Sequence, residues 1–164
     1  MQECTSVDDH TMDMLIALHA APAVPALLAL AVRKPLAPEH DLLTAWIAHH
    51  FSPAWASEAR AALANRPLTL FIATRGNPAE LLGFCAYDAT ARGFVGPIGV
   101  RDTARRSGIG AALLLACLHD MRAMGYGYAI AGAVGAPEFF RQVAGAMEIP
   151  NSTPGIYAGM LRAP

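Results

Sequence analysis

Charge is scarce in this chain, and that scarcity excludes a class of partner. Only 15% of the 164 residues are charged, and 12 basic side chains nearly balance 13 acidic ones, for a net charge of -1. A broad nucleic-acid surface needs an excess of Lys and Arg, so we expect no nucleic-acid partner. The hydrophobic share of 54% excludes a disordered chain, and the length suits one domain.

Cysteine is also scarce, and the chain has no metal-binding motif. Its three cysteines, Cys4, Cys85 and Cys117, are too few and too widely spaced for a disulfide framework or a zinc ribbon. None of the six histidines belongs to an HExxH motif, so we expect no metal site. This cysteine usage is typical of a reducing compartment, which predicts a cytoplasmic protein.

No uninterrupted apolar run is long enough to predict a membrane helix. Residues 14–32 are apolar, but Pro22 and Pro25 interrupt them. Three aspartates between residues 8 and 13 stand where a signal peptide carries positive charge. We therefore expect no membrane association and no cleaved segment.

The changing hydrophobic period along the chain predicts an α/β domain. Pro97 has no N–H group, so the strand around it should be bulged or unpaired on one edge. The strands around residues 68–74 and 81–87 should form a hairpin across Arg75-Gly-Asn-Pro78. Strands are expected at 14–18, 31–36, 68–74, 81–87, 94–100, 128–134 and 155–161, and helices at 23–31, 38–50, 53–65, 108–124 and 137–144.

The segment from Val100 to Leu114 predicts an anion site. After a strand and a basic turn, Gly108-x-Gly110 opens a strongly amphipathic helix. The first turn of a helix has unpaired N–H groups and a positive dipole end, and glycine lets a phosphate approach the backbone. A pyrophosphate fits such a turn, although a glycine-opened helix beside a solvated charge run would have the same sequence. Neither a P-loop nor a complete dinucleotide fingerprint is present.

This segment resembles motif A of the GCN5-related N-acetyltransferases, whose pattern is [Gln/Arg]-x-x-Gly-x-[Gly/Ala] after a central strand. Arg105, Gly108 and Gly110 match it, and Gly96-Pro-Ile-Gly-Val100 is similar to the family's bulged fourth strand. The resemblance implies an α/β (α+β) fold: a mixed, mostly antiparallel sheet flanked by helices and splayed between its fourth and fifth strands. The domain would span residues 31–164, with residues 1–30 as an N-terminal extension packed on it.

The resemblance also implies acetyl-coenzyme A (acetyl-CoA) as co-substrate. Backbone groups of Ile98 and Val100 would pair with the pantetheine arm, and backbone N–H groups of residues 106–111 would hold the pyrophosphate. The full set of implied cofactor contacts is Ile98, Gly99, Val100, Arg105, Arg106, Ser107, Gly108, Ile109, Gly110, Ala111 and Phe140.

Catalytic candidates are fewer. Many family members carry a tyrosine on the last helix that protonates the departing thiolate, but Phe139, Phe140 and Arg141 stand at the matching positions. Tyr157 could substitute as the acid, or it could be a core tyrosine. Asp88 is the nearest candidate base, or it could cap the turn after its strand.

The acceptor amine should meet the junction of the first two helices, where aromatic residues gather. The substrate-binding candidates are Trp46, His50, Phe51 and Tyr87, although the tryptophans could instead pack the helices on the sheet. The predicted function is transfer of an acetyl group to a primary amine of a small molecule or peptide, by direct attack in a ternary complex. A non-catalytic acyl-CoA-binding sensor and a structural domain without a nucleotide are the alternatives, and a homodimer is compatible with the sequence.

Overall fold

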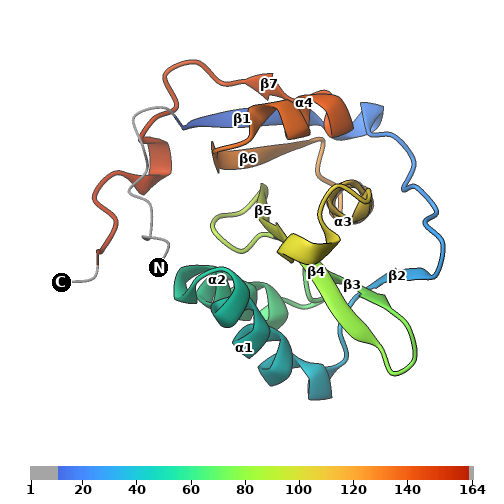
Figure 1. The fold of residues 1–164 in the computed structure, drawn as a ribbon. Helices are drawn as coiled ribbons and strands as arrows, with labels where there is room; N and C mark the ends of the chain where they lie inside the picture. The colour runs from blue at the N-terminus through green and yellow to red at the C-terminus, as the bar shows by residue number, and fades with distance from the viewer. Residues whose placement is uncertain (1–10, 163–164) are drawn as a thin grey trace.

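A seven-stranded sheet with helices on both faces organises the computed structural model, which describes residues 11–162 (Figure 1). Its spatial order is β2-β3-β4-β5-β6-β1-β7, and every neighbouring pair is antiparallel except the parallel pair β5–β6. This confirms the α/β class and the mixed, mostly antiparallel sheet. The strands are β1 (Met12–Ala17), β2 (Leu30–Arg33), β3 (Leu70–Arg75), β4 (Glu80–Tyr87), β5 (Phe94–Val100), β6 (Tyr128–Val134) and β7 (Met147–Glu148).

The helices divide between the two faces of the sheet. Those described are α1 (His40–His50), α2 (Pro53–Ala64), α3 (Ile109–Ala123) and α4 (Pro137–Ala144). Alternation along β4 shows the division: Cys85 and Tyr87 belong to the core beneath α3, whereas Phe84 and Ala86 belong to the core beneath α1 and α2. None of the helices within residues 11–162 is long and apolar enough to cross a membrane.

The N-terminal part of the chain supplies an inner strand of the sheet. The strand expected at 14–18 forms as β1, which pairs antiparallel with both β6 and β7. Met14, Ile16 and Leu18 are completely buried on one side of it. Residues 1–30, expected to pack on the domain as an extension, therefore contribute a strand from Met12 onward. Residues 1–10 lie outside the described part.

Two expected elements do not form. Residues 21–27 contain no helix, because Pro22 and Pro25 each remove an N–H donor and the segment runs extended toward β2. Residues 155–161 form no strand: Gly155–Tyr157 is a short 3-10 turn, η4, and the residues after it have no regular structure. Beside β6, on the side away from β5, the sheet continues with β1 and then β7.

Strand β5 is bulged, as Pro97 predicts. Tyr87 of β4 pairs with Val95, but Cys85 pairs with Ile98, so β5 carries one extra residue between these pairs. On its other side, β5 has ladder pairs with β6 only at Phe94 and Val95 within the described chain. The splay between these two strands stays a prediction, and this short ladder supports it.

Candidate active site

The turn after β5 leads to a helix N-terminus that is open to solvent. Gly108 caps α3 with φ +82°, a left-handed conformation that favours glycine. Ile109, Gly110 and Ala111 follow in the first turn, so their N–H groups have no partner within the helix. Because residues 105–108 are all exposed, an anion can reach these groups from solvent.

Short-range bonds order this turn. Arg105 Nε donates to the Val100 carbonyl at 3.2 Å, and the Arg105 guanidinium pairs with Asp102 at 3.1 Å. Ser107 Oγ donates to the Ala104 carbonyl at 2.6 Å. The Arg105 side chain is still 61% exposed. The turn therefore holds its shape while its positive charge stays at the rim.

One edge of β5 is open beside this turn. The Arg101 N–H donates to the Leu82 carbonyl at 3.0 Å, which makes these two residues a hydrogen-bonded pair. Paired positions alternate in an antiparallel ladder, so Ile98 and Val100 direct their N–H and C=O groups away from β4. The β6 ladder ends before both residues. Apart from the Val100 carbonyl bonded to the turn, these groups line an open strand edge.

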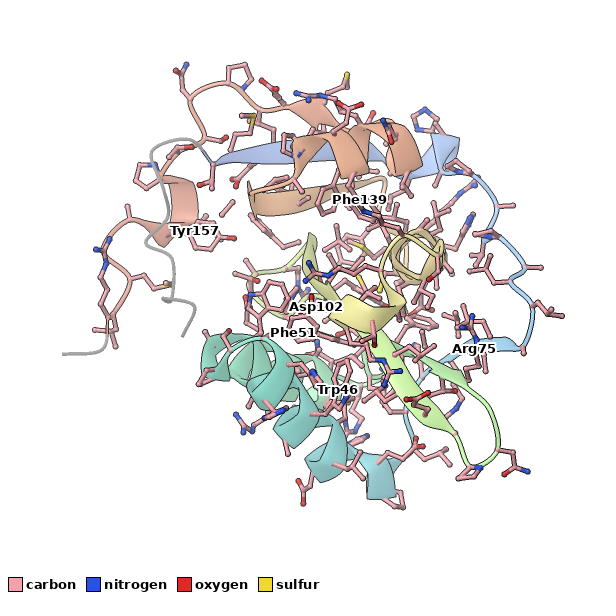
Figure 2. The ribbon with its side chains drawn as sticks, in the orientation of Figure 1. Trp46, Phe51, Arg75, Asp102, Phe139 and Tyr157 are labelled. Atoms are coloured by element: carbon pink, nitrogen blue, oxygen red, sulfur yellow. The ribbon has the colours of Figure 1, made fainter. Side chains whose placement is uncertain are left out.

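Helix α4 places a different phenylalanine at the turn from the one expected. Phe140, the expected cofactor contact, is only 9% exposed and lies in the core beneath α3. Its neighbour Phe139 lies beside the first turn of α3, with ring carbons 3.5 Å from where a Cβ on Gly110 would stand (Figure 2). Adjacent helix residues point in different directions, so one step along the helix separates a core side chain from a site side chain.

The aromatic residues at the α1–α2 junction do gather. We call Trp46, His50, Phe51 and Trp55 the aromatic group. Ring centroids are 4.6 Å apart for Trp46–His50, 5.7 Å for Trp46–Phe51 and 5.2 Å for the stacked pair Phe51–Trp55. Phe51 lies directly on β5, because a Cβ on Gly99 would stand 2.6–2.9 Å from three of its ring carbons. Phe51 thus covers β5 from the α1–α2 side, with Trp46 behind it on α1 (Figure 2).

Tyr87 does not join the aromatic group. It is fully buried on the α3 side of the sheet, where its hydroxyl donates to Asp120 at 2.8 Å. Lys34 pairs with the same carboxylate at 2.8 Å. Burial and the Asp120 carboxylate raise the pKa of Tyr87. Strand alternation therefore places Tyr87 on the face opposite the proposed acceptor contacts.

Asp88 is committed to the turn between β4 and β5. Its Oδ1 accepts from the Gly93 N–H at 2.7 Å, and its Oδ2 accepts from the Tyr126 hydroxyl at 2.7 Å. Asp88 itself has φ +50°. Both carboxylate oxygens thus hold the turn, and the capping alternative replaces the expectation of a free base at this position.

Tyr157 reaches β6 from the C-terminal segment, although η4 and not a strand carries it. A Cβ on Gly132 would collide with the Tyr157 hydroxyl and would stand 2.8–2.9 Å from two carbons of the Phe94 ring. Gly132 faces the α1–α2 side, since its neighbour Ala131 faces the core beneath α3. Burial, with the carboxylates of Asp13 and Glu58, raises the pKa of Tyr157 to about 12. The phenol is therefore protonated at neutral pH, as an acid must be.

Glu58 on α2 is a candidate catalytic carboxylate that the sequence did not indicate. Its carboxylate accepts a hydrogen bond from the Thr90 hydroxyl in the loop after β4. Burial raises the pKa of Glu58, while the Thr90 bond lowers it by less. The available signal was a single acidic residue in an alanine-rich helix, one turn after Trp55.

Residues 37–144 match the sequence profile of the Acetyltransferase (GNAT) family, about two thirds of the chain. The chain belongs to this family. No curated protein matches the chain at the sequence level.

Solved GNAT structures show the same fold. The GCN5-related glucosamine N-acetyltransferase region of a fungal multi-domain β-N-acetylglucosaminidase superposes with a TM-score of 0.69 at 14% identity, covering 87% of this chain and 20% of that one. A GCN5-related N-acetyltransferase from Sphaerobacter thermophilus gives 0.64 at 21% identity, covering 84% and 48%. A third, from Kribbella flavida, gives 0.54 at 15% identity, covering 84% and 54%. This GNAT chain thus spans between a fifth and about half of the chains it matches.

The GNAT match begins after β1 and ends with α4. It includes the aromatic group, β5, the turn and Phe139. It leaves out β1, β2, β7 and η4, and so does not reach Tyr157.

Proposed function

We propose that the chain is an acetyl-CoA-dependent N-acetyltransferase that moves an acetyl group to a primary amine of a small molecule or peptide. One observation carries this proposal: a single bulged strand, β5, joins three parts of a site. Its open edge runs past Ile98 and Val100 to the exposed N-terminus of α3. Its α1–α2 face carries Phe51.

The residues present fit the cofactor. The N–H groups of residues 106–111 and the helix dipole would hold the pyrophosphate, with Arg105 and Arg106 at the rim. The Ile98 carbonyl and the Val100 N–H on the open edge would pair with the amide groups of the pantetheine arm, and Phe139 would line the first turn of α3. When bound, acetyl-CoA supplies an activated acetyl thioester.

Direct attack by the amine is the mechanism that the described residues favour. Cys85 and Cys117 are both buried on the α3 side, away from the aromatic group, so neither is placed to carry the acetyl group as an intermediate nucleophile. The acceptor would reach β5 past the aromatic group. The Ile98 N–H on the open edge would stabilise negative charge on the carbonyl oxygen, and Tyr157 would protonate the departing thiolate.

The first test is acetyl-CoA binding measured by calorimetry. Gly108→Glu places a side chain and a negative charge in the turn, at a φ of +82°, and should abolish micromolar binding. Gly125→Glu is the matched control: Gly125 has φ +97° and open space around it at the other end of α3, so the same strain and charge should leave binding intact. Absence of binding to folded wild-type protein would overturn the proposal.

Thiol release separates the transferase from a non-catalytic acyl-CoA-binding protein. Two observations favour the non-catalytic protein as the second candidate. Both carboxylate oxygens of Asp88 are hydrogen-bonded within its turn, and α4 carries no tyrosine. A transferase releases free thiol from acetyl-CoA only when an amine is added. A sensor binds acetyl-CoA with the same Gly108 dependence and releases none.

A further inference from the structure

We infer that Glu58 is the general base that takes the proton of the acceptor amine, with Tyr157 opposite it as the acid for the leaving thiolate. This inference rests on the proposed function and assigns to α2 a role that no other described carboxylate near the site fills.

The position of Glu58 follows from its helix. Trp55 and Glu58 are three residues apart on α2, so they share one side of the helix. Trp55 packs on Phe51 and Phe84, with ring centroids 5.2 and 6.1 Å apart, so this side faces the sheet. The bond from Thr90 then holds Glu58 toward the loop that precedes β5. Glu58 therefore lies on the same side of β5 as the aromatic group.

Tyr157 approaches the same region from the other half of the molecule. Its hydroxyl rests on Gly132 of β6, beside Phe94, where the β5–β6 ladder ends. Burial, followed by the carboxylates of Asp13 and Glu58, raises the pKa of Tyr157. An acyl group carried along the open edge of β5 toward the end of this ladder would come between Glu58 and Tyr157.

Glu58 has the free oxygen that Asp88 lacks. Thr90 bonds to Oε1, and Oε2 has no hydrogen bond or ion pair among residues 11–162. Tyr157 is the titratable group whose pKa the Glu58 carboxylate raises, after burial and Asp13, and Asp13 itself accepts from the Ala133 N–H at 2.9 Å. No cation among the described residues pairs with Glu58. A half-buried, unpaired carboxylate is a stronger base than one in water, because burial disfavours its charged form.

Glu58 and Tyr157 together account for both protons that the ammonium group loses. The amine enters as an ammonium and loses one proton to Glu58 Oε2. The C–N bond forms, the C–S bond breaks, and the thiolate takes the Tyr157 hydroxyl proton. The second amine proton restores Tyr157 through water, and Glu58 releases its proton to solvent. The products are the amide, free thiol and one proton.

The test compares Glu58→Gln with Glu148→Gln, a control on β7 that removes a surface carboxylate paired with Arg141. Acetyl transfer to 2-phenylethylamine and to a lysine-terminated peptide is followed by thiol release from pH 6 to 10. A general base contributes about 10²–10⁴-fold. Glu58→Gln should therefore lower kcat/KM by about 10²-fold or more at pH 7, and the loss should shrink as pH approaches the amine pKa of about 10. Glu148→Gln should match wild type.

Calorimetry and unfolding complete the test. Glu58→Gln should bind acetyl-CoA as wild type does and should be no less stable, since glutamine removes the cost of burying a charge. Tyr157→Phe should lower kcat while leaving acetyl-CoA binding unchanged.

The remaining outcomes distinguish failure of the base assignment, of the transferase proposal and of the cofactor site. A loss in Glu58→Gln of equal size at every pH, or no loss, overturns the base assignment while the transferase proposal stands. Acetyl-CoA binding without thiol release for either amine overturns both the transferase and its base. No acetyl-CoA binding at all overturns the proposed cofactor site.

Discussion

At two glycines of the sheet, aromatic side chains occupy the space where a Cβ atom would be. Phe51 fills that space at Gly99, and Tyr157 with Phe94 fills it at Gly132. Neither glycine has a positive φ, so the requirement is one of space and not of backbone conformation. The rings can thus lie directly on β5 and β6.

Gly99→Ala tests this packing at the scale of one residue. The added methyl group would stand 2.6–2.9 Å from the Phe51 ring, and overpacking of this kind costs about 1–3 kcal/mol. We expect that loss in the free energy of unfolding, measured by urea denaturation.

The double variant Gly99→Ala with Phe51→Leu is the control. Removing the ring relieves the collision, so adding Gly99→Ala to Phe51→Leu should cost less than adding it to wild type. Equal costs in both backgrounds would show that Phe51 does not limit the space at Gly99.

At the scale of elements, the N-terminal segment and not the C-terminal one lies in the sheet, where β1 stands between β6 and β7. Residues 12–17 bury Met14 and Ile16 completely. Residues 155–161 contain two glycines, and their apolar residues Ile156, Met160 and Leu161 are 54–96% exposed. The N-terminal segment adds Met14 and Ile16 to the core beneath α3, which favours it as the strand. The C-terminal segment remains outside and brings Tyr157 to the face of β6.

Paired isoleucine variants distinguish the two segments. Ile16→Ala should cost about 2–5 kcal/mol of unfolding free energy, the usual range for a fully buried isoleucine. Ile156→Ala should cost under about 0.5 kcal/mol, because its side chain is half exposed. Urea unfolding of both variants measures this. The reverse order would place the C-terminal segment in the sheet.

At the scale of the whole molecule, buried tyrosines make stability fall in strong base. The pKa of Tyr157 is raised to about 12 by burial, and burial also raises that of Tyr87. Below pH 10 both phenols are protonated in the folded and unfolded states. Between about pH 10 and 12 the unfolded chain loses these protons first, so the free energy of unfolding decreases as pH rises.

Tyr157→Phe should remove part of that decrease. Unfolding free energies of wild type and variant are measured by urea denaturation from pH 9 to 12. The change of this free energy with pH should be similar in the two proteins near pH 9. Above pH 10 it should be steeper in wild type than in the variant. Identical slopes throughout would mean that the Tyr157 phenol is as accessible in the folded protein as in the unfolded chain.

The local features of the site could be read from the chain alone because their chemistry is local. A left-handed cap requires Gly108, a missing N–H bulges β5 at Pro97, and Ser52 accepts the Trp55 N–H to start α2. The family resemblance of the turn rested on the same local pattern. The aromatic group also followed, since its members are neighbours in sequence.

Long-range contacts determined the rest. Whether Phe139 or Phe140 faces the turn, and which side of β4 carries Tyr87, depends on how each element is rotated against the sheet. The approach of Tyr157 to Gly132 of β6 joins residues 25 positions apart, and the place of β1 between β6 and β7 joins the two ends of the described chain. Such choices are made by packing between distant segments, for which a single sequence contains no local signal.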